Sequence, residues 1–321
     1  MTSRHLVDPE LLPMLDLLPQ VALSAETLPA LRSRETALPL PPVVPNAVIR
    51  RDTTIAGPGG AADVPLVIYT PPGAGPFPCI YHMHGGGYVS GSAGILEFVH
   101  RPISEQLGCV IVSVDYRLAP ETSFPGNIED CYAGLAWTFN HAGELNVDVG
   151  RIGLMGESAG GGLAAALALL VRDRGEYQVT FQLLTYPMLD DRTCIADPHP
   201  FAGEFLWTPP NNLFSWTALL GDEPGGSGVS AYAAPARATD LSGLPPTFIM
   251  TGALDLFVDE NIEYARRLIR AGIPTELHVY PGAFHAFDAL PTAYVGARAR
   301  EDRLNALRKF LKLAGSPPRA T

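Results

Sequence analysis

The first candidate for chemistry is Ser158, which lies in the pattern Gly156-Glu157-Ser158-Ala159-Gly160, or G-x-S-x-G. The pattern is short enough to occur by chance, so the elements predicted on either side of it decide whether Ser158 is a nucleophile. The apolar run at 151–156 predicts a strand, and residues 159–174 predict a helix that begins directly after the serine. So tight a turn needs small flanking residues, and a helix N-terminus favours developing negative charge. We therefore expect Ser158 to be a nucleophile rather than an ordinary turn residue.

A serine hydroxyl attacks only if a base takes its proton. In strand–turn–helix folds of this kind the chain order is serine, acid, then histidine. Of the eight histidines, only His278 and His285 lie far downstream of Ser158. His278 falls inside a predicted strand at 275–280, whereas His285 follows that strand in a loop. His285 is therefore the predicted base.

The base must be oriented by a carboxylate, and Asp255 is the predicted one. It follows the predicted strand 246–251, at the sheet edge where His285 is also expected. Asp259 has the position of a residue that starts a helix, and Glu157 points away from Ser158 in so tight a turn. The four rival carboxylates are Asp240, Asp259, Asp288 and Glu157.

A second motif, His84-Gly85-Gly86-Gly87, ends a predicted strand at 78–83. Consecutive glycines let backbone N–H groups approach a substrate closely, and an oxyanion needs such donors. We expect the N–H groups of Gly86, Gly87 and Ala159 to form an oxyanion hole. The alternative is a flexible loop, which fits poorly with glycines placed directly on a strand end.

His82 and His84 form an H-x-H pair, and two histidines at this spacing could be ligands of a metal ion. A metal site needs a third ligand, and the sequence offers none nearby. We therefore predict no metal and no other cofactor. His84 is expected to fix the glycine loop through a hydrogen bond, and His82 to be a buried residue with satisfied partners.

The elements that must position these residues alternate between strand and helix. Strands are predicted at 48–55, 64–70, 78–84, 109–115, 151–156, 179–186, 246–251 and 275–280. Helices are predicted at 128–140, 159–174, 259–271 and 298–313, with a short amphipathic helix near 11–18. Such alternation implies right-handed crossovers, so we predict an α/β fold with a mostly parallel central sheet flanked by helices.

Two segments, the N-terminal arm and an insertion, do not follow the alternation of strands and helices, and we predict that together they form a cap. We divide the chain into an N-terminal arm (1–45), a catalytic core in two parts (46–189 and 242–321) and a cap insertion (190–241). The insertion carries five aromatic residues, which need something to cover, so a plain surface excursion is the weaker interpretation. The predicted lining of the substrate pocket is Tyr88, Glu157, Phe205, Trp207 and Leu256.

Composition excludes several classes of function. The chain has 22 basic and 33 acidic residues, a formal net charge of −11, and no basic run, which argues against nucleic acid or an anionic membrane as a partner. None of the four cysteines forms a CxxC pair. The N-terminus lacks the pattern of a signal peptide and no apolar run reaches membrane-spanning length, so we expect a cytoplasmic protein with a small-molecule substrate.

Together these motifs resemble the hormone-sensitive-lipase-like family of bacterial carboxylesterases (family IV). Residues 115–121 read DYRLAPE, and residues 156–161 read GESAGG, as in that family. Asp255 with Asp259 and Glu260 is similar to the family's D-P-L-x-D-E segment. The chain departs from the family at Leu256, where proline is common, and at Ala286, where glycine is usual. The resemblance runs from about residue 64 to the C-terminus.

The resemblance implies the α/β-hydrolase fold and an acyl-enzyme mechanism on short-chain esters, acetyl to butyryl. It also implies structural roles for Asp115, Arg117 and Glu121, which would brace the glycine loop. Residues 207–216 and 232–244 are similar to a group of acetylesterases, which implies acetyl esters of bulky alcohols. Similar proteins commonly form homodimers through the last strand and the C-terminal helix. Two alternatives remain open: a receptor of the same fold that binds without catalysis, and a hydrolase of amides, lactones or carbamates.

Overall fold

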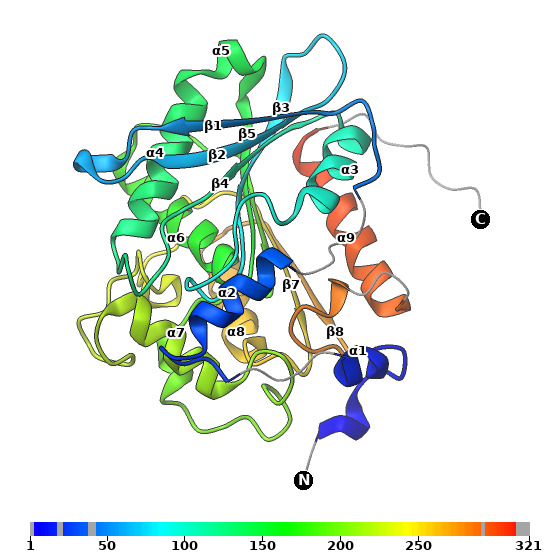
Figure 1. Cartoon of the computed structure of the whole chain (residues 1–321), viewed down its shortest axis with the longest axis vertical. Helices are drawn as coiled ribbons and strands as arrows, with labels where there is room; N and C mark the ends of the chain where they lie inside the picture. Colours follow the sequence, from blue (N-terminus) through cyan, green and yellow to red (C-terminus); the bar gives the residue numbers. More distant parts are fainter. Residues whose placement is uncertain (1–2, 18–21, 38–42, 290–292, 313–321) are drawn as a thin grey trace.

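The computed structural model describes the chain except for residues 1–2, 18–21, 38–42, 290–292 and 313–321 (Figure 1). Leu18 and Leu313, the last residues of two predicted helices, lie outside the described residues. The described residues form an eight-stranded sheet in the order β1-β2-β4-β3-β5-β6-β7-β8. The pairs β1/β2 and β2/β4 are antiparallel, and all later pairs are parallel. The predicted fold class is therefore confirmed.

The eight predicted strands are all present. They are β1 (Ile49–Ile55), β2 (Val64–Thr70), β3 (Phe77–Met83), β4 (Val110–Val114), β5 (Val147–Glu157), β6 (Gln182–Thr185), β7 (Thr247–Gly252) and β8 (Thr275–Tyr280). The central strands are buried on both faces, as parallel strands covered by helices must be. Strand β8 forms one edge of the sheet, and the pairing of two chains through it stays a prediction.

Helices cover both faces of the sheet (Figure 1). The helices are α1 (Leu12–Leu17), α2 (Leu28–Ala37), α3 (Glu97–Leu107), α4 (Gly126–Asn140), α5 (Ala142–Leu145), α6 (Ala159–Arg174), α7 (Pro209–Leu220), α8 (Val258–Arg270) and α9 (Tyr294–Phe310). Helices α4, α6 and α8 share one apolar core with the sheet, and α3 and α9 share the core on the other face.

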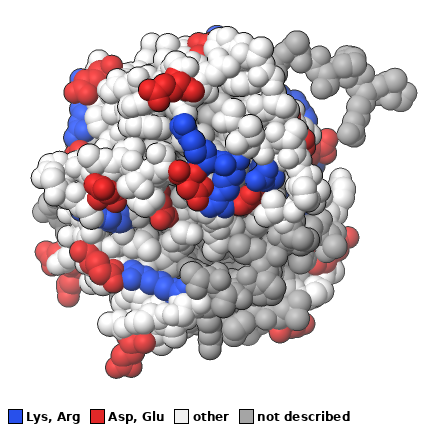
Figure 2. Space-filling view, turned by 45° about the horizontal axis from the view of Figure 1, so that its top comes forward, with Lys and Arg blue, Asp and Glu red and all other residues white. Residues whose placement is uncertain are grey.

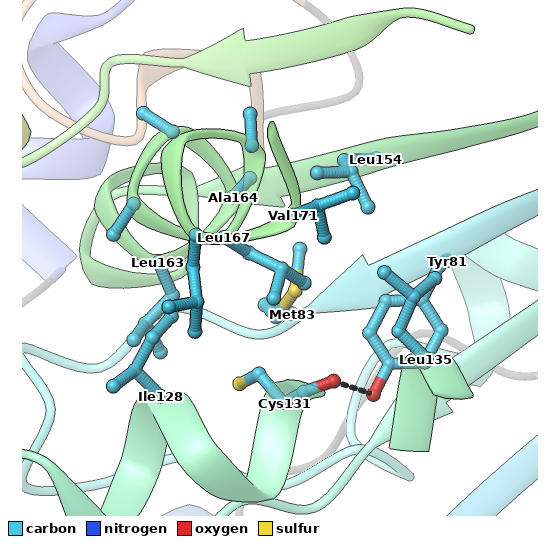
Figure 3. Close-up of a cluster of buried hydrophobic side chains, with 14 of the residues drawn as sticks. Tyr81, Met83, Ile128, Cys131, Leu135, Leu154, Leu163, Ala164, Leu167 and Val171 are labelled. Atoms are coloured by element: carbon cyan, nitrogen blue, oxygen red, sulfur yellow. Dashed lines mark hydrogen bonds between the residues drawn. The ribbon is translucent and has the colours of Figure 1, made fainter. Parts of the chain in front are cut away.

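Helix α6 is the centre of the larger core (Figure 3). Every residue from Ala159 to Val171 is buried, because the helix packs against β3 and β5 on one side and α4 on the other. The Tyr81 hydroxyl on β3 donates a hydrogen bond of 2.9 Å to the carbonyl of Cys131 on α4. A buried leucine in such a core contributes about 2–5 kcal/mol relative to alanine. The helix that begins at Ser158 is therefore held on a rigid platform.

The N-terminal arm packs on the insertion. The Ser3 hydroxyl donates to the Glu204 carboxylate at 2.6 Å, and the Leu23 N–H donates to the Asn211 side chain at 2.9 Å. Leu28 of α2 joins a small apolar cluster with Val89, against which Phe214 of α7 also packs. Two segments that are about 200 residues apart in the sequence thus lie together near the carboxyl ends of the strands.

The sequence analysis did not predict helices α2, α3, α5 and α7, and α3 shows one reason. Its buried face includes two polar residues, His100 and Ser104, and its interior contains Pro102. Both features weaken the hydrophobic periodicity that marks a helix. Strand β5 also begins at Val147, four residues before the predicted start at 151; the continuous apolar run begins only at Ile152, because residues 148–151 are exposed or half-exposed.

Acidic and basic side chains are interspersed on the face drawn in Figure 2, with uncharged surface between them. Arg50 of β1 pairs with both Asp52 and Glu97. Within the described ranges, no helix combines the length and apolar character needed to cross a membrane.

Candidate active site

Three residues predicted from separate loops meet in one hydrogen-bonded chain. The Ser158 Oγ lies 2.9 Å from His285 Nε2, and His285 Nδ1 lies 2.8 Å from Asp255 Oδ2. Both contacts are satisfied when Nδ1–H donates to the carboxylate and Nε2 accepts from the hydroxyl. The residues follow β5, β7 and β8, whose carboxyl ends share one edge of the sheet. The topology therefore explains why positions 158, 255 and 285 converge.

The turn at Ser158 is strained and leaves no room for larger neighbours. Ser158 has φ 57° and ψ −120°, a conformation that non-glycine residues rarely adopt. A Cβ on Gly160 would lie 2.1 Å from the Met83 carbonyl oxygen, and one on Gly156 would lie 2.2 Å from the Gly160 oxygen. The pattern around Ser158 is thus required by close backbone packing between β5, α6 and β3.

The Asp255 carboxylate is fully buried and fixed on both oxygens. Its Oδ1 accepts a hydrogen bond of 2.9 Å from the Phe257 N–H, while Oδ2 faces His285. The rival carboxylates have other partners or positions. Asp259 stands in the first turn of α8, and Asp288 accepts a 2.7 Å hydrogen bond from the Tyr186 hydroxyl.

Tyr186 is a site residue that the sequence analysis missed. Its ring centroid lies 4.7 Å from that of His285, and its hydroxyl is tied to Asp288, which also faces Arg303 at 3.2 Å. The residue directly follows β6, at the same edge of the sheet as Ser158 and His285. Its position at the end of a predicted strand could therefore have identified Tyr186 as a candidate residue of the site.

The glycine loop (residues 84–87) lies beside Ser158. A Cβ on Gly87 would lie 2.3 Å from the Trp207 ring, and one on Gly86 would lie 2.2 Å from the Ser90 carbonyl oxygen. Both glycines have positive φ, 119° at Gly86 and 61° at Gly87. Among the described residues, no protein acceptor takes the N–H of Gly86, Gly87 or Ala159. These three donors remain available to a ligand.

His84 and the segment 115–121 hold this loop in place. The Tyr116 hydroxyl donates to the His84 carbonyl at 2.7 Å, and the two rings stack with centroids 4.2 Å apart. Burial lowers the pKa of His84 to about 4, so the imidazole is neutral. Asp115 accepts from the Ala93 N–H at 2.7 Å, close to the loop.

Arg117 and Glu121, the other two charged residues of the segment 115–121, each form an ion pair with a different part of the molecule. Arg117 pairs with the buried carboxylate of Asp130 on α4 at 2.7 Å. Glu121 instead pairs with Arg32 of the N-terminal arm at 2.8 Å. Arg117 thus anchors the segment to the core, and Glu121 anchors it to α2.

His82 and His84 do not share a ligand. The two ring nitrogens of His82 lie 2.8 Å from the Ser113 hydroxyl and 2.8 Å from the Glu157 carboxylate. The Nδ1 of His84 lies 2.8 Å from the Gly85 carbonyl. In the part of the chain that the structure describes, no group of three or more potential ligands could hold a metal ion.

A cavity of about 440 Å³ opens over Ser158 and His285. Two of the residues predicted to line it, Glu157 and Trp207, do so. The described lining consists of Leu23, Leu31, His84, Gly85, Gly86, Gly87, Ser90, Gly91, Ile95, Leu96, Glu157, Ser158, Tyr186, Leu206, Trp207, Asn211, His285, Ala286 and Ala289.

Tyr88, Phe205 and Leu256 are corrections, since they are absent from that described lining. The Tyr88 hydroxyl points inward and donates to the Met188 carbonyl at 3.1 Å. Phe205 packs on Phe284 with ring centroids 5.9 Å apart, and Leu256 lies against the backbone at Gly203. Sequence neighbours of a site can turn their side chains into the core, and these three do.

Several residues that line the cavity belong to no motif in the sequence and were not predicted. Leu23 and Leu31 come from the arm, and Leu96 precedes α3. These are single apolar residues more than 60 positions from Ser158, so nothing in their own sequence surroundings pointed to the site.

Comparisons with known proteins agree with this geometry. Residues 80–289 match the profile of a family described as alpha/beta hydrolase fold. Carboxylesterase NlhH of Mycobacterium tuberculosis is 36% identical over 294 residues, which cover 89% of this chain and 90% of the relative. The arylesterase of Saccharolobus solfataricus is 32% identical over 246 residues, covering 74% of this chain and 79% of the relative. The solved structure of a bacterial heroin esterase superposes with a TM-score of 0.91 at 42% identity, covering 97% and 99% of the two chains.

Proposed function

The chain belongs to the hormone-sensitive-lipase-like family of α/β-hydrolase-fold carboxylesterases, as its motifs predicted, and on this basis we propose that Ser158, His285 and Asp255 are its catalytic triad. The observation that carries the proposal is the hydrogen-bonded chain between these side chains at the floor of a cavity. A carboxylesterase needs a nucleophile, a base and an oriented carboxylate, and these residues supply all three.

The proposed reaction has two halves. In the first, the Ser158 oxygen forms a bond to the ester carbonyl carbon while His285 Nε2 takes the hydroxyl proton. The tetrahedral intermediate collapses by breaking the bond between the carbonyl carbon and the alcohol oxygen, and His285 gives its proton to that oxygen as the alcohol leaves. In the second half, His285 takes a proton from the water that attacks the acyl carbon. The second tetrahedral intermediate then breaks its bond to the Ser158 oxygen, which takes the proton back from His285 as the acid leaves. Asp255 holds the imidazole tautomer and stabilises the imidazolium.

The oxyanion of each intermediate is assigned to the N–H groups of Gly86, Gly87 and Ala159. Support comes from two features: the two glycines line the cavity beside Ser158, and none of the three groups is a donor elsewhere in the described residues. Ala159 is also the first residue of α6, whose N-terminus favours negative charge. Each such donor contributes about 100-fold or more to the rate.

We assign substrates with short acyl groups, acetyl to butyryl, and a cap composed of the arm and the insertion. Leu23 and Leu31 from the arm and Trp207 and Asn211 from the insertion contribute to one cavity, which supports enclosure of the substrate. The relative of known structure is named for heroin, and the likeness supports an acetyl ester of a bulky alcohol.

Hydrolysis of p-nitrophenyl acetate by the purified protein, beside Ser158→Ala, tests the proposal. We expect turnover in the natural sequence and release near background in the variant. Equal activity in both would overturn the assignment of the nucleophile. Binding without turnover, for this and for a panel of acetyl esters, would favour the receptor alternative. Comparison of ester and amide analogues of one acyl group separates esterase from amidase activity.

A further inference from the structure

A second cavity of about 360 Å³ adjoins the cavity over Ser158. The two cavities meet at side chains that line both of them, which are Leu96, Glu157, Tyr186 and Ala289. Helices α3 and α9 contribute most of the described lining of the second cavity, and they lie side by side on one face of the sheet (Figure 1). The proposed hydrolysis assigns no occupant to this space.

Apolar side chains of both helices form its walls. Val99, Pro102 and Ile103 come from α3, and Leu304 comes from α9. Ile103 is buried, and Val99 and Leu304 pack against the apolar core to which Ile103 belongs. A hydrocarbon chain that enters such a space is removed from water, which is favourable. The walls of the second cavity therefore suit an alkyl group.

The charged groups of the second cavity balance one another. Among its described lining residues, the carboxylates of Asp288 and Glu157 are matched by the guanidinium groups of Arg300 and Arg303. Arg303 lies 3.2 Å from the Asp288 carboxylate, and Arg300 donates to the Asp288 backbone carbonyl. A charged ligand group would disturb this balance, whereas an uncharged group needs no counter-charge. The second cavity therefore favours a neutral occupant.

The second cavity lies on the His285 side of the site. In the proposed reaction the glycine loop holds the carbonyl oxygen, and the alcohol oxygen must lie within reach of His285, which gives it a proton. The described lining of the second cavity includes no residue of the glycine loop. It does include Tyr186, whose ring centroid lies 4.7 Å from that of His285, and Asp288 and Ala289, which follow His285 in the chain. The space therefore extends from the side where the alcohol leaves.

We propose that the cavity between α3 and α9 is a subsite for the alcohol part of the ester, and that this esterase selects short-acyl esters of alcohols with an uncharged alkyl chain. This selectivity, which rests on the proposed function, is asymmetric. A chain on the alcohol side of the ester bond has the second cavity to enter, whereas a chain on the acyl side has only the cavity over Ser158.

Esters that differ in the position of the chain test the subsite. Hexyl acetate is compared with ethyl acetate, which lacks the chain, and with ethyl hexanoate, an isomer that carries the chain on the acyl side. Titration of the released acid measures turnover. We expect kcat/KM for hexyl acetate to exceed the values for both other esters roughly tenfold or more. Burial of one methylene group favours binding about fourfold, so burial of about two is sufficient.

Variants that fill the second cavity identify where the chain lies. Leu304→Trp adds an indole to the wall on α9, and it should reduce the ratio of hexyl acetate to ethyl acetate toward one. Val99→Trp narrows the cavity from α3 and replaces Leu304→Trp if thermal unfolding shows that the latter does not fold. Ile269→Trp is the matched control, because Ile269 is 58% exposed on α8 and lies outside the described lining of both cavities. It should leave the ratio unchanged.

The outcomes separate the subsite from the esterase function. A ratio near one in the natural sequence overturns the subsite, and so does a ratio that a folded Leu304→Trp or Val99→Trp keeps. Equal gains for hexyl acetate and ethyl hexanoate overturn its assignment to the alcohol side. If p-nitrophenyl acetate is hydrolysed in a Ser158-dependent reaction while the chain brings no gain, the proposed function stands and the subsite fails. If no ester is hydrolysed, the proposed function fails and the subsite fails with it.

Discussion

Replacing Arg32 by alanine is expected to release helix α2 from the glycine loop. The Arg32 guanidinium donates to the Val89 carbonyl at 2.7 Å and to the Ala119 carbonyl at 2.8 Å, and it pairs with Glu121. Val89 in turn donates to the Gly86 carbonyl at 3.1 Å. One side chain therefore connects the arm to the loop that is proposed to hold the oxyanion.

The magnitude follows from these contacts. A hydrogen bond from a charged donor contributes about 1.5–3 kcal/mol, and we take the low end because Arg32 is part-exposed, with 29% of its side chain accessible. Two carbonyl contacts then give about 3 kcal/mol. The ion pair adds little, about 0–1 kcal/mol, since 65% of the Glu121 side chain is accessible. Loss of about 3 kcal/mol lowers the docking equilibrium of α2 roughly 150-fold.

Amide hydrogen exchange over α2 measures that docking, and kcat with KM for p-nitrophenyl acetate measures its consequence. Arg32→Ala should speed exchange in α2 and lower kcat more than it raises KM, because the glycine loop is proposed to hold the oxyanion of the transition state. Glu121→Gln is the control, since it removes the ion pair and keeps both carbonyl contacts. If Arg32→Ala exchanges and turns over like the natural sequence, the reasoning is wrong. If Glu121→Gln matches Arg32→Ala, the ion pair and not the carbonyl contacts holds the arm.

Two further predictions concern substrate length and pH. Acetyl and butyryl p-nitrophenyl esters should be hydrolysed faster than esters with acyl chains beyond about ten carbons, because the cavity over Ser158 has a volume of only about 440 Å³; a rate profile that peaks at long chains contradicts this. The free energy of unfolding should fall as the pH is lowered from about 6.5 to about 4, because burial lowers the pKa of His84 to about 4 and the unfolded chain binds a proton first. Urea unfolding across that window measures the loss, about 3 kcal/mol from His84 alone, and a flat profile refutes it.

The convergence of Ser158, Asp255 and His285 could be predicted because their positions follow from the topology of the sheet. Parallel strands bring their carboxyl ends to one edge, so a serine, an aspartate and a histidine that each follow such a strand must converge. The bounds of α6 and β8 coincide with those predicted at 159–174 and 275–280. Helix α6 is apolar and buried as far as Val171 and is followed by Gly175, and β8 is followed by Pro281 and Gly282.

The cavity walls could not be predicted in the same way. Whether Tyr88 faces the substrate or the core depends on where the Met188 carbonyl lies, which no local pattern encodes. Leu31 reaches the cavity through the docking of α2, and α2 has almost no amphipathic pattern of its own. Side-chain direction and packing between distant segments are properties of the assembled fold. The residues that line the cavity were therefore harder to predict from the sequence than the three residues proposed to react.

Backbone strain in the molecule is concentrated where the chemistry is proposed. Seven non-glycine residues in the described chain have positive φ. Asn146 and Lys312 follow the ends of helices α5 and α9, where this conformation is ordinary. The remaining five are Tyr88, Ser158, Tyr186, Leu206 and Ala286, and all but Tyr88 line the cavity.

Ala286 explains one departure from the family pattern. Its φ of 59° is a conformation that glycine adopts without strain, which is why glycine is usual after the catalytic histidine. Each strained residue costs about 1–3 kcal/mol, so the surrounding structure must over-determine the conformation. At Tyr186 it does so through the 2.7 Å hydrogen bond to Asp288, and at Ser158 through the 2.9 Å bond from its N–H to the Thr185 carbonyl. The frame beneath the cavity therefore holds the reacting atoms in place, and loosening that frame should reduce activity even where every reacting group is kept.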